Sequence, residues 1–458
     1  MSSVQPFPVP FPYSPMRQTL FYIPETIFGQ PLVEWGILLL IVAVLLSHVY
    51  QYVRHWTISG IGSSLTLLVI GTVLLVFVIP NLAEAGRGIP IRGYGVCLVV
   101  AIFSGLALAL HLAKRQNIAA DKIYGLCFWT VIIGIIGARV FHVTEYWQEM
   151  LSFDHSGQLL LRESFFSVIN FAQGGLTVFG SIIGGIVAAL IFMYFNKMPV
   201  FRTFDIMAPA TILGIAIGRI GCLLNGCCFG GVADTSWAIV FPPGSPAHTH
   251  QVTHGDAFIY GLKFEERMVG RHKVLAVAEV LPDSDAESQG IVPNMVLRNV
   301  FFQQRGERMI ETPHTRQNAA ELLTHLQRTM PDEKVQFDFF TNASPPEVVS
   351  HHLTPGTSIV LPVHPTQIYS SILAFLLCGT LLLLRQLRFY QEREGLLLAS
   401  FMILYSVGRF MIEVVRTDED AFFGTGMTIS QNVSIVFGTL GIAFFVYKVV
   451  SKNRHSGK

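Results

Sequence analysis

Long apolar runs are the feature that most limits what this chain can fold into. Crossing a bilayer takes about 20 apolar residues per helix, and a helix also satisfies its own backbone hydrogen bonds, as the hydrocarbon interior requires. Nine such runs lie near residues 32–53, 61–83, 93–113, 123–144, 171–195, 203–224, 365–386, 395–415 and 429–449. The sequence therefore predicts an all-α polytopic membrane protein.

The composition supports this class. Only 13% of the residues are charged, whereas a soluble protein usually has about a quarter. The formal net charge of +1 argues against nucleic acid as a partner. The N-terminus lacks the basic flank and cleavage site of a signal peptide, so we expect the first apolar run to remain as an anchor. Before it, residues 1–30 are rich in proline and aromatic residues, which predicts an irregular arm near the membrane surface.

Basic residues indicate the orientation. They occupy alternate connections between the runs, and the rule that basic loops stay inside predicts that these connections are cytoplasmic. The N-terminus and the long connection 231–362 then lie outside, and the C-terminus lies in the cytoplasm. The residues concerned are Lys114, Arg115, Lys122, Lys197, Arg202, Arg385, Arg388, Arg393, Lys452, Arg454 and Lys458.

The connection 231–362 is too long for a loop and needs its own fold. Its pattern predicts a helix over 317–328 and strands at 260–264, 273–280, 295–297 and 335–340. This order resembles a PDZ domain over about 255–342. In such domains the loop corresponding to Tyr260–Phe264 receives a chain end, which adds a strand to the sheet, so a peptide is a candidate ligand. The alternative is a small α/β insertion that only shields the outer mouth.

The histidines and cysteines outside the motifs have ordinary explanations. We expect five histidines of the insertion to be solvated linker residues: His248, His250, His254, His351 and His352. Cys227 and Cys228 are adjacent and therefore poorly placed to bridge each other. Buried cysteines are usually small apolar fillers. A minor alternative is thiol or metal chemistry at Cys222, Cys227 and Cys228 with His364, but we expect no metal and no cofactor.

Polar residues inside the apolar runs are candidates for function, because an ionisable group at membrane depth is costly. The stretch 218–230 places Arg219, Asn225 and three cysteines among four glycines. Three further pairs are spaced to share one side of a helix: Arg139 with His142, Asp205 with Arg219, and Arg409 with Glu413. The last pair can neutralise itself. Interhelical pairs or snorkelling side chains are the structural alternative for all of these residues.

Two other segments have unusual patterns. Residues 173–185 concentrate glycines, and Gly180 and Gly184 form a small-xxx-small face for helix packing. His364 and Pro365 open an apolar run with proline in its first turn, a favourable helix start. The insertion leaves and returns near this point, so we expect His364 to lie close to the Cys227–Cys228 turn.

The order of these motifs resembles the prolipoprotein diacylglyceryl transferase family, seven-helix membrane enzymes of bacterial lipoprotein biosynthesis. The likeness runs from about Arg92 to Val449 and is interrupted by the insertion. It excludes the two N-terminal spans, so the chain divides into 1–90 (arm and extra spans), 91–232 (core, first part), 233–362 (insertion) and 363–458 (core, second part). It rests on Tyr94-Gly95, Gly137-Ala138-Arg139, Gly174-Gly175 with Gly180, Asp205 with Pro209, the 218–230 stretch, His364 to Tyr369, and Gly408-Arg409 with Glu413.

The resemblance implies an activity and roles. Such enzymes move a diacylglyceryl group from phosphatidylglycerol to the lipobox cysteine thiol of an exported prolipoprotein, in the bacterial cytoplasmic membrane, and release glycerol phosphate. Arg219 and Arg139 would hold the phosphate, and His364, His142 or Tyr94 would supply acid–base help, with His364 as the preferred base. The remaining substrate-binding candidates are Asn225, Gly230, Gly174, Gly180, Asp205, His142, Arg409 and Glu413, and amides of the glycines around Asn225 would help to orient the headgroup.

Four positions differ from the family pattern. Phe179 stands in place of a histidine, Cys222 of an asparagine, Cys227 of a glutamate and Val363 of an arginine. The alternative function is therefore a membrane scaffold that kept the lipid-binding cavity, lost transfer chemistry and binds partners through its outer domain.

Overall fold

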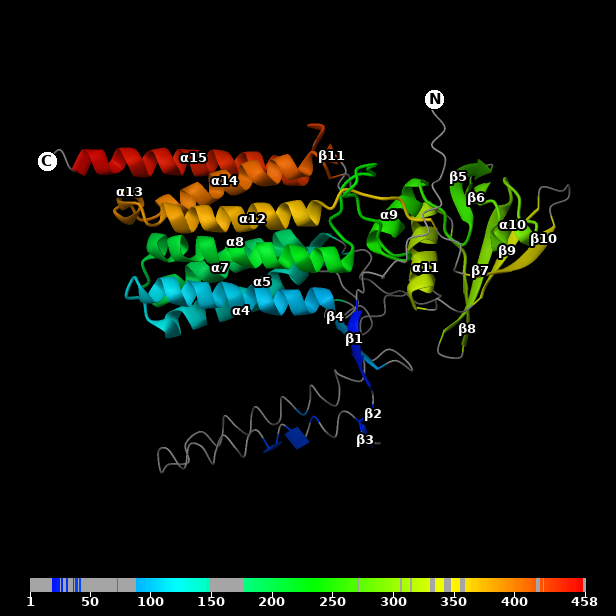
Figure 1. Cartoon of the computed structure of the whole chain (residues 1–458), viewed down its shortest axis with the longest axis horizontal. Coiled ribbons are helices and arrows are strands. Elements are labelled where there is room, and N and C mark those ends of the chain that lie inside the picture. Colours follow the sequence, from blue (N-terminus) through cyan, green and yellow to red (C-terminus); the bar gives the residue numbers. More distant parts are fainter. Residues whose placement is uncertain are drawn as a thin grey trace. The chain divides into compact units, whose positions relative to one another are not determined.

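A computed structural model describes most of the chain from residue 88 onward and a few residues before it (Figure 1). The described residues are 19–24, 26–27, 30–31, 36, 38–39, 41–42, 72, 88–145, 147, 168, 177–269, 272–304, 307–313, 315–329, 334–341, 347–354, 359–416, 421–422 and 424–455. The chain divides into two compact units. Unit 1 comprises Met1–Cys97 and Ile220–Gln367, and unit 2 comprises Leu98–Arg219 and Ile368–Lys458.

Within the described residues, seven helices are long and apolar enough to cross a membrane. They are α4 (Gly93–Lys114), α5 (Ala120–Glu145), α7 (Val178–Phe195), α8 (Val200–Asn225), α12 (Thr366–Leu384), α14 (Leu396–Glu413) and α15 (Ile429–His455). The last seven predicted runs are thereby confirmed as helices of a polytopic membrane protein. The runs 32–53 and 61–83 lie almost wholly outside the described residues, as do residues 171–176 of the fifth run.

The basic connections of unit 2 meet at one end of its helices (Figure 1). The Lys122 ammonium at the start of α5 donates a hydrogen bond to the Asn196 carbonyl after α7, at 2.8 Å. The Arg202 guanidinium at the start of α8 pairs with the Glu394 carboxylate at 2.5 Å, in the connection that follows the short helix α13 (Arg388–Gln391). Three connections that the sequence places on one side of the membrane are therefore joined directly.

Helices α5 and α7 approach each other through glycine. A Cβ atom at Gly180 would lie 2.3 Å from the Gly137 carbonyl oxygen, and one at Gly184 would lie 2.8 Å from that of Ile133. No side chain fits at such distances, so the two backbones touch directly. The predicted packing role of Gly180 and Gly184 is confirmed.

The β-rich region belongs to unit 1 and forms one antiparallel six-stranded sheet in the order β10-β9-β7-β6-β5, with β8 paired to β7. Its strands are β5 (Leu262–Val269), β6 (His272–Val280), β7 (Val296–Gln304), β8 (Glu307–Glu311), β9 (Val335–Phe340) and β10 (Val348–Leu353), and its helices are α9 (Pro246–His254), α10 (Asp285–Ser288) and α11 (Arg316–Thr329). The four predicted strands and the predicted helix are present. The sequence prediction missed α9, α10, β8 and β10.

Alternate strand residues and one helix face build the core of this region. Phe337 and Phe339 point inward from β9, as the two-residue period of a strand requires. Ala319, Leu323 and Leu326 of α11 recur at helical spacing and are also fully buried. The sheet and helix therefore share one apolar core of their own.

Part of the N-terminal arm is a strand. Residues Thr19–Ile23 (β1) pair antiparallel with Ile89–Arg92 (β4), directly before α4. The expectation of an irregular arm is wrong for this segment, because β4 supplies hydrogen-bond partners from distant sequence. Shorter ladders join β2 (Thr26–Ile27) to β3 (Gln30–Pro31) and β11 (Ala421–Phe422) to β12 (Met427–Thr428).

Two histidines of the insertion are buried, so the expectation that all five are solvated is wrong. His351 lies in β10 beside Phe339 and is 8% exposed. His248 lies in α9 and has no exposed surface. Its Nδ1 accepts a hydrogen bond from the Gly244 amide at 3.0 Å, so its Nε2–H donates to the Phe258 carbonyl at 3.2 Å. This arrangement requires the neutral ring.

Replacing Gly180 with alanine should destabilise the α5–α7 contact. The new Cβ would overlap the Gly137 carbonyl, so we expect a loss of about 1–3 kcal/mol in unfolding free energy. Thermal unfolding of the detergent-solubilised protein measures the effect. The matched control is Gly379→Ala in α12, where a Cβ meets no atom within 4 Å. Equal stability of the two variants would contradict direct backbone packing.

His248 should make the stability of the insertion depend on pH. Burial lowers the pKa of His248 to about 4 from 6.5, partly opposed by its bond to Phe258. A lowered histidine pKa contributes stability that is complete above pH 6.5 and is lost as the pH falls towards 4. The loss amounts to about 3 kcal/mol. Melting temperatures from pH 7 to pH 4 should fall less steeply for His248→Gln than for wild type, whereas the exposed control His352→Gln should match wild type.

Candidate functional site

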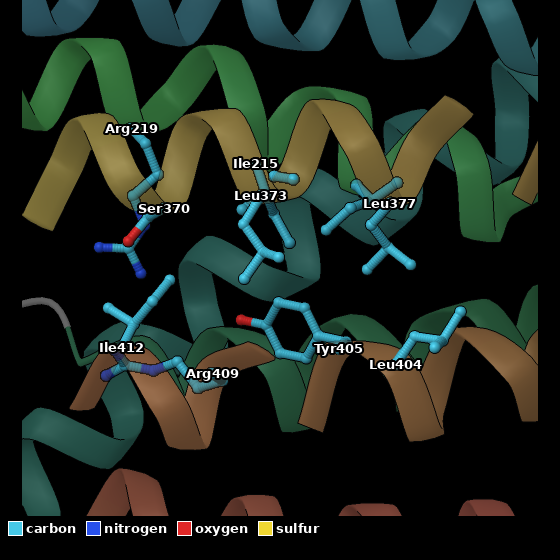
Figure 2. Close-up of a pocket in the computed structure, with 11 residues that line it drawn as sticks. Ile215, Arg219, Ser370, Leu373, Leu377, Leu404, Tyr405, Arg409 and Ile412 are labelled. Carbon is cyan, nitrogen blue, oxygen red and sulfur yellow. The ribbon is translucent and has the colours of Figure 1, made fainter. Parts of the chain in front are cut away.

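A pocket in unit 2 combines arginines with apolar side chains (Figure 2). It lies among α8, α12 and α14 and has a volume of about 30 Å³, enough for about one water molecule. Arg219 and Arg409 stand at one end, and leucine and isoleucine side chains extend from them along the helices. The lining residues are Ile212, Ile215, Arg219, Ser370, Leu373, Ala374, Leu377, Leu404, Tyr405, Arg409 and Ile412.

Glu413 compensates part of the positive charge. Its side chain has no exposed surface, and its Oε2 lies 2.6 Å from Nη1 of Arg409 and 3.7 Å from Nη1 of Arg416. Nη2 of Arg409 also donates to the Ser430 hydroxyl of α15 at 2.7 Å. The predicted neutralisation of Arg409 by Glu413 is therefore present, and this carboxylate is shared by two guanidinium groups.

Arg219 differs from Arg409 in having no anion beside it. Among the described residues, its guanidinium forms no hydrogen bond or ion pair, and it is near enough to Arg409 for the two cations to repel each other. Arg409 and Arg416 share the Glu413 carboxylate and Arg219 has none, so these four residues together carry a net charge of +2. Arginine binds phosphate with paired, charge-assisted hydrogen bonds, so this end of the pocket has the chemistry of a phosphate site.

Hydrogen bonds between α8 and α12 hold the pocket walls together. The Ser371 hydroxyl donates to the Ala216 carbonyl at 2.8 Å, and the Cys378 thiol donates to the Pro209 carbonyl at 3.4 Å. Both contacts are buried in an apolar cluster that includes Ile212. They fix the relative height of Arg219 and Ser370 on facing helices.

Arg139 and His142 lie in α5 of the same unit. Arg139 is buried, and its Nε donates a hydrogen bond to the Val168 carbonyl at 2.8 Å. His142 is half-buried one turn further along α5. Neither residue lines the pocket of Arg219. Gly180 contributes a close helix contact, and Gly174 lies outside the described residues.

Asp205 has a structural partner that the sequence did not indicate. Its two carboxylate oxygens accept hydrogen bonds from the Gly395 and Leu398 amides, at 2.6 and 2.8 Å. These amides belong to the start of α14, whose first N–H groups have no partner within the helix. Asp205 therefore caps α14 from another helix.

In unit 1, the turn after α8 is held by the start of α12. The Gln367 side-chain amide donates to the Cys227 carbonyl at 2.7 Å, and the Thr366 hydroxyl donates to the Cys228 carbonyl at 2.6 Å. The His364 amide donates to the Gly231 carbonyl at 3.0 Å. His364 is thus close to the cysteine turn, as predicted, and its half-buried ring stands directly before α12.

Two glycine amides of this turn already donate hydrogen bonds within the protein. The Gly226 amide donates to the Cys222 carbonyl, and the Gly230 amide donates to the His364 carbonyl at 2.9 Å. Both amides therefore already have acceptors within the protein, and a role for Gly230 in substrate binding stays a prediction. The Asn225 side chain contacts the Cys227 thiol, and Tyr94 packs beside Gly221, where a Cβ would lie 3.2 Å from its ring.

The sequence prediction missed several residues of the arginine pocket and of the turn that contains Cys227 and Cys228. Ser370 and Tyr405 line the arginine pocket, Arg416 shares Glu413, and Thr366 and Gln367 hold the cysteine turn. Thr366 and Gln367 follow His364 in the sequence motif, so their polarity at the start of an apolar run was a usable signal. The sequence contains no such signal for Ser370 and Tyr405, because isolated hydroxyl groups are common in spanning helices.

Comparison with known proteins decides the family. A family model described as prolipoprotein diacylglyceryl transferase matches residues 80–447. The chain belongs to the prolipoprotein diacylglyceryl transferase family. A family member from Rhodopirellula baltica, named phosphatidylglycerol–prolipoprotein diacylglyceryl transferase, is 32% identical over 92% of this chain and 87% of its own length. Relatives of the same name from Trichormus variabilis and Acaryochloris marina are 36% and 37% identical, over 36% of this chain and 54% and 56% of their own lengths.

The family members differ in how much of the chain they match. The match to the Rhodopirellula relative extends over 92% of the chain. The cyanobacterial relatives match about a third of the chain.

Removing the Asp205 carboxylate should destabilise the protein through α14. Asp205→Ala leaves the buried Gly395 amide and the partly buried Leu398 amide without acceptors, which costs about 1–3 kcal/mol for a buried amide, whereas Asp205→Asn keeps an acceptor and should lose less. Thermal unfolding in detergent measures the difference. Asp121→Ala, at an exposed position of α5, is the control. A normal melting temperature for Asp205→Ala, together with weaker substrate binding, would contradict the capping role.

Proposed function

We propose that this chain transfers a diacylglyceryl group from phosphatidylglycerol to the lipobox cysteine thiol of exported lipoprotein precursors. Family membership and the names of its relatives support the reaction. The observation on which the proposal mainly rests is Arg219, a guanidinium without an anionic partner among the described residues, at the end of an apolar pocket. A phospholipid has the matching pattern, a phosphate joined to long apolar chains.

The reaction explains why a cation is needed there. The thiol loses its proton to a base, and its sulfur bonds to the glyceryl carbon that carries the phosphate. The carbon–oxygen bond breaks, and glycerol phosphate leaves with the bonding electrons. Negative charge grows on that phosphate as it departs, so Arg219 stabilises the transition state more than the ground state. Arg139 serves as a second phosphate contact in this proposal.

His364 is the proposed base. Only the thiolate is a good nucleophile, and imidazole is the side chain that most often acts as a general base. The backbone of His364 is held on both sides by Gly230 and Gly231, which supports a fixed ring position. Tyr94 and His142 are the alternative acid–base groups, and Asn225, Arg409 and Glu413 are proposed substrate contacts.

The small size of the pocket bears on how the lipid enters. A volume of about 30 Å³ cannot hold a diacylglyceryl group. Its walls include Leu373 and Leu404, both more than a third exposed on the lipid-facing surface of the helices. We therefore propose that the acyl chains remain in the bilayer and that only the headgroup enters between α12 and α14.

The alternative function, a lipid-binding scaffold without transfer activity, gains no support from the comparisons. Val363, in place of the family arginine, is buried and pairs with Ile239 through its backbone. Phe179, in place of the family histidine, is 37% exposed at the start of α7. Both substitutions put an apolar side chain where the family has a polar group, so in this proposal the chain relies on other residues there.

We also propose the finer organisation that the sequence indicates. Residues 1–90 form the arm and two further spans, 91–232 and 363–458 form the transferase core, and 233–362 lies outside the cytoplasmic membrane with the N-terminus. The C-terminus is then cytoplasmic. The joined basic connections of unit 2 support this orientation.

The β-rich region is proposed to be a PDZ-like peptide-binding domain. The order β5, β6, β7, α11, β9 is the order of strands and helix that the sequence predicts for such a domain, with α10 and β8 added to it. Strand β5 ends the sheet order, so among the described residues one edge is open to an added strand. The proposed ligand is an extended peptide chain end.

Arg219→Ala should reduce transfer by about 10²- to 10³-fold, the usual effect of removing a group that stabilises developing charge. Arg219→Lys should keep part of the activity, because lysine keeps the charge but not the paired geometry. The assay expresses each variant in cells depleted of their own transferase and detects lipidated lipoproteins by mass. Arg388→Ala, whose side chain is 91% exposed, is the control. Full rescue by Arg219→Ala would contradict the phosphate role.

Peptide binding should depend on a free chain end. We expect a fluorescent peptide with a free carboxyl terminus to bind the purified protein more tightly than its amidated form, by calorimetry or anisotropy. A variant lacking residues 246–359 should bind neither peptide. Equal binding of the two forms, or binding that survives the deletion, would contradict the PDZ-like role.

A further inference from the structure

Three thiols converge at the turn that follows α8. Cys222, Cys227 and Cys228 each offer a sulfur, and the three Sγ atoms lie within 4.8 Å of one another. Among the described residues this is the one group of histidine, cysteine or acidic side chains close enough together to hold a metal ion. We propose that these three cysteines form a binding site for a thiophilic metal ion, with Zn²⁺ as the ion that fits best.

The sulfur spacing suits tetrahedral zinc. Zinc–sulfur bonds of about 2.3 Å place the sulfurs of a tetrahedral site about 3.8 Å apart, so the three thiols need to move inward by at most about 1 Å. Thiolate is a soft ligand that selects Zn²⁺ or Cu⁺ over Mg²⁺ or Ca²⁺. The cluster is half-buried, which leaves it reachable from solution.

The backbone of the turn is fixed in the conformation that brings the three sulfurs together. Gly226 and Cys228 both have left-handed backbone conformations, with φ of +75° and +59°. Such a conformation is unfavourable for a cysteine and persists only where the surroundings impose it. The side chains of Gln367 and Thr366 impose it here, through their bonds to the Cys227 and Cys228 carbonyls.

A buried acceptor beside the turn is a second, independent indication of a ligand. Gln367 has no exposed surface. One end of its amide donates to the Cys227 carbonyl, while its Oε1 has no hydrogen-bond partner among the described residues. A buried acceptor without a donor is costly. A water molecule that completes the coordination of the metal would supply the missing donor.

Binding is an acid–base step with no change of oxidation state. Three S–H groups release three protons to solvent, and three thiolates donate electron pairs to one Zn²⁺. The ion then links the end of α8 to the turn that α12 holds. This inference does not depend on the transferase reaction, since it concerns residues that differ from the family pattern at two of the three positions.

Metal analysis of the purified full-length protein tests the site. After chelation and exposure to Zn²⁺, we expect one zinc per chain, together with intense thiolate-to-cobalt charge-transfer absorption when Co²⁺ replaces Zn²⁺. Cys222→Ser, Cys227→Ser and Cys228→Ser should each weaken zinc binding at least tenfold. Cys127→Ser, a half-buried cysteine of α5, is the matched control and should bind as wild type does.

Thiol protection in the wild-type protein gives a result even if the variants fail to fold. Of the six cysteines, Zn²⁺ should protect Cys222, Cys227 and Cys228 from alkylation, as read by peptide mass. Absence of stoichiometric zinc, unchanged zinc binding when all three cysteines are replaced by serine, or protection of other cysteines would overturn the proposal. A disulfide joining Cys222 to Cys227 or Cys228 in protein prepared without oxidant would also overturn it.

Discussion

Positive charge inside an apolar helix bundle is the constraint on which unit 2 depends. Taking a guanidinium out of water costs several kcal/mol unless an anion and hydrogen bonds accompany it. Glu413 and Ser430 meet this requirement for Arg409, and Arg416 shares the same carboxylate. Arg219 has no such partner among the described residues. An unbalanced cation at this depth is tolerable in a protein whose substrate supplies the anion.

The rest of unit 2 holds these charges in register. Helix α5 meets α7 through glycine backbones, and α8 is fixed to α12 through the Ser371–Ala216 bond. Asp205 anchors the start of α14 to α8. Because α8 and α14 carry Arg219 and Arg409, the cap at one end of α14 also sets the height of the arginine near its other end. Substitutions at Asp205 therefore bear on the pocket without touching it.

Local features of the chain were predictable. A spanning helix needs only a long apolar run, so the seven described helices matched their predicted positions. The close packing at Gly180 and the Arg409–Glu413 pair also followed from helical spacing alone. The sequence did not show that the Gly230 amide already has an acceptor, or that His248, expected to be solvated, is buried. Gly230 donates to the carbonyl of His364, which lies far along the chain, and the burial of His248 depends on how the insertion packs.

The sequence by itself determined the membrane class, the family motifs and the candidate residues, because hydrophobic length and motif order are properties of the chain. Only the tertiary structure decided which partners each candidate residue has. It assigned Asp205 to a helix cap and Glu413 to two arginines, left Arg219 without an anion among the described residues, and brought three thiols together at one turn. The reason is physical: the role of a buried polar group depends on the groups within hydrogen-bond distance, and those come from remote segments.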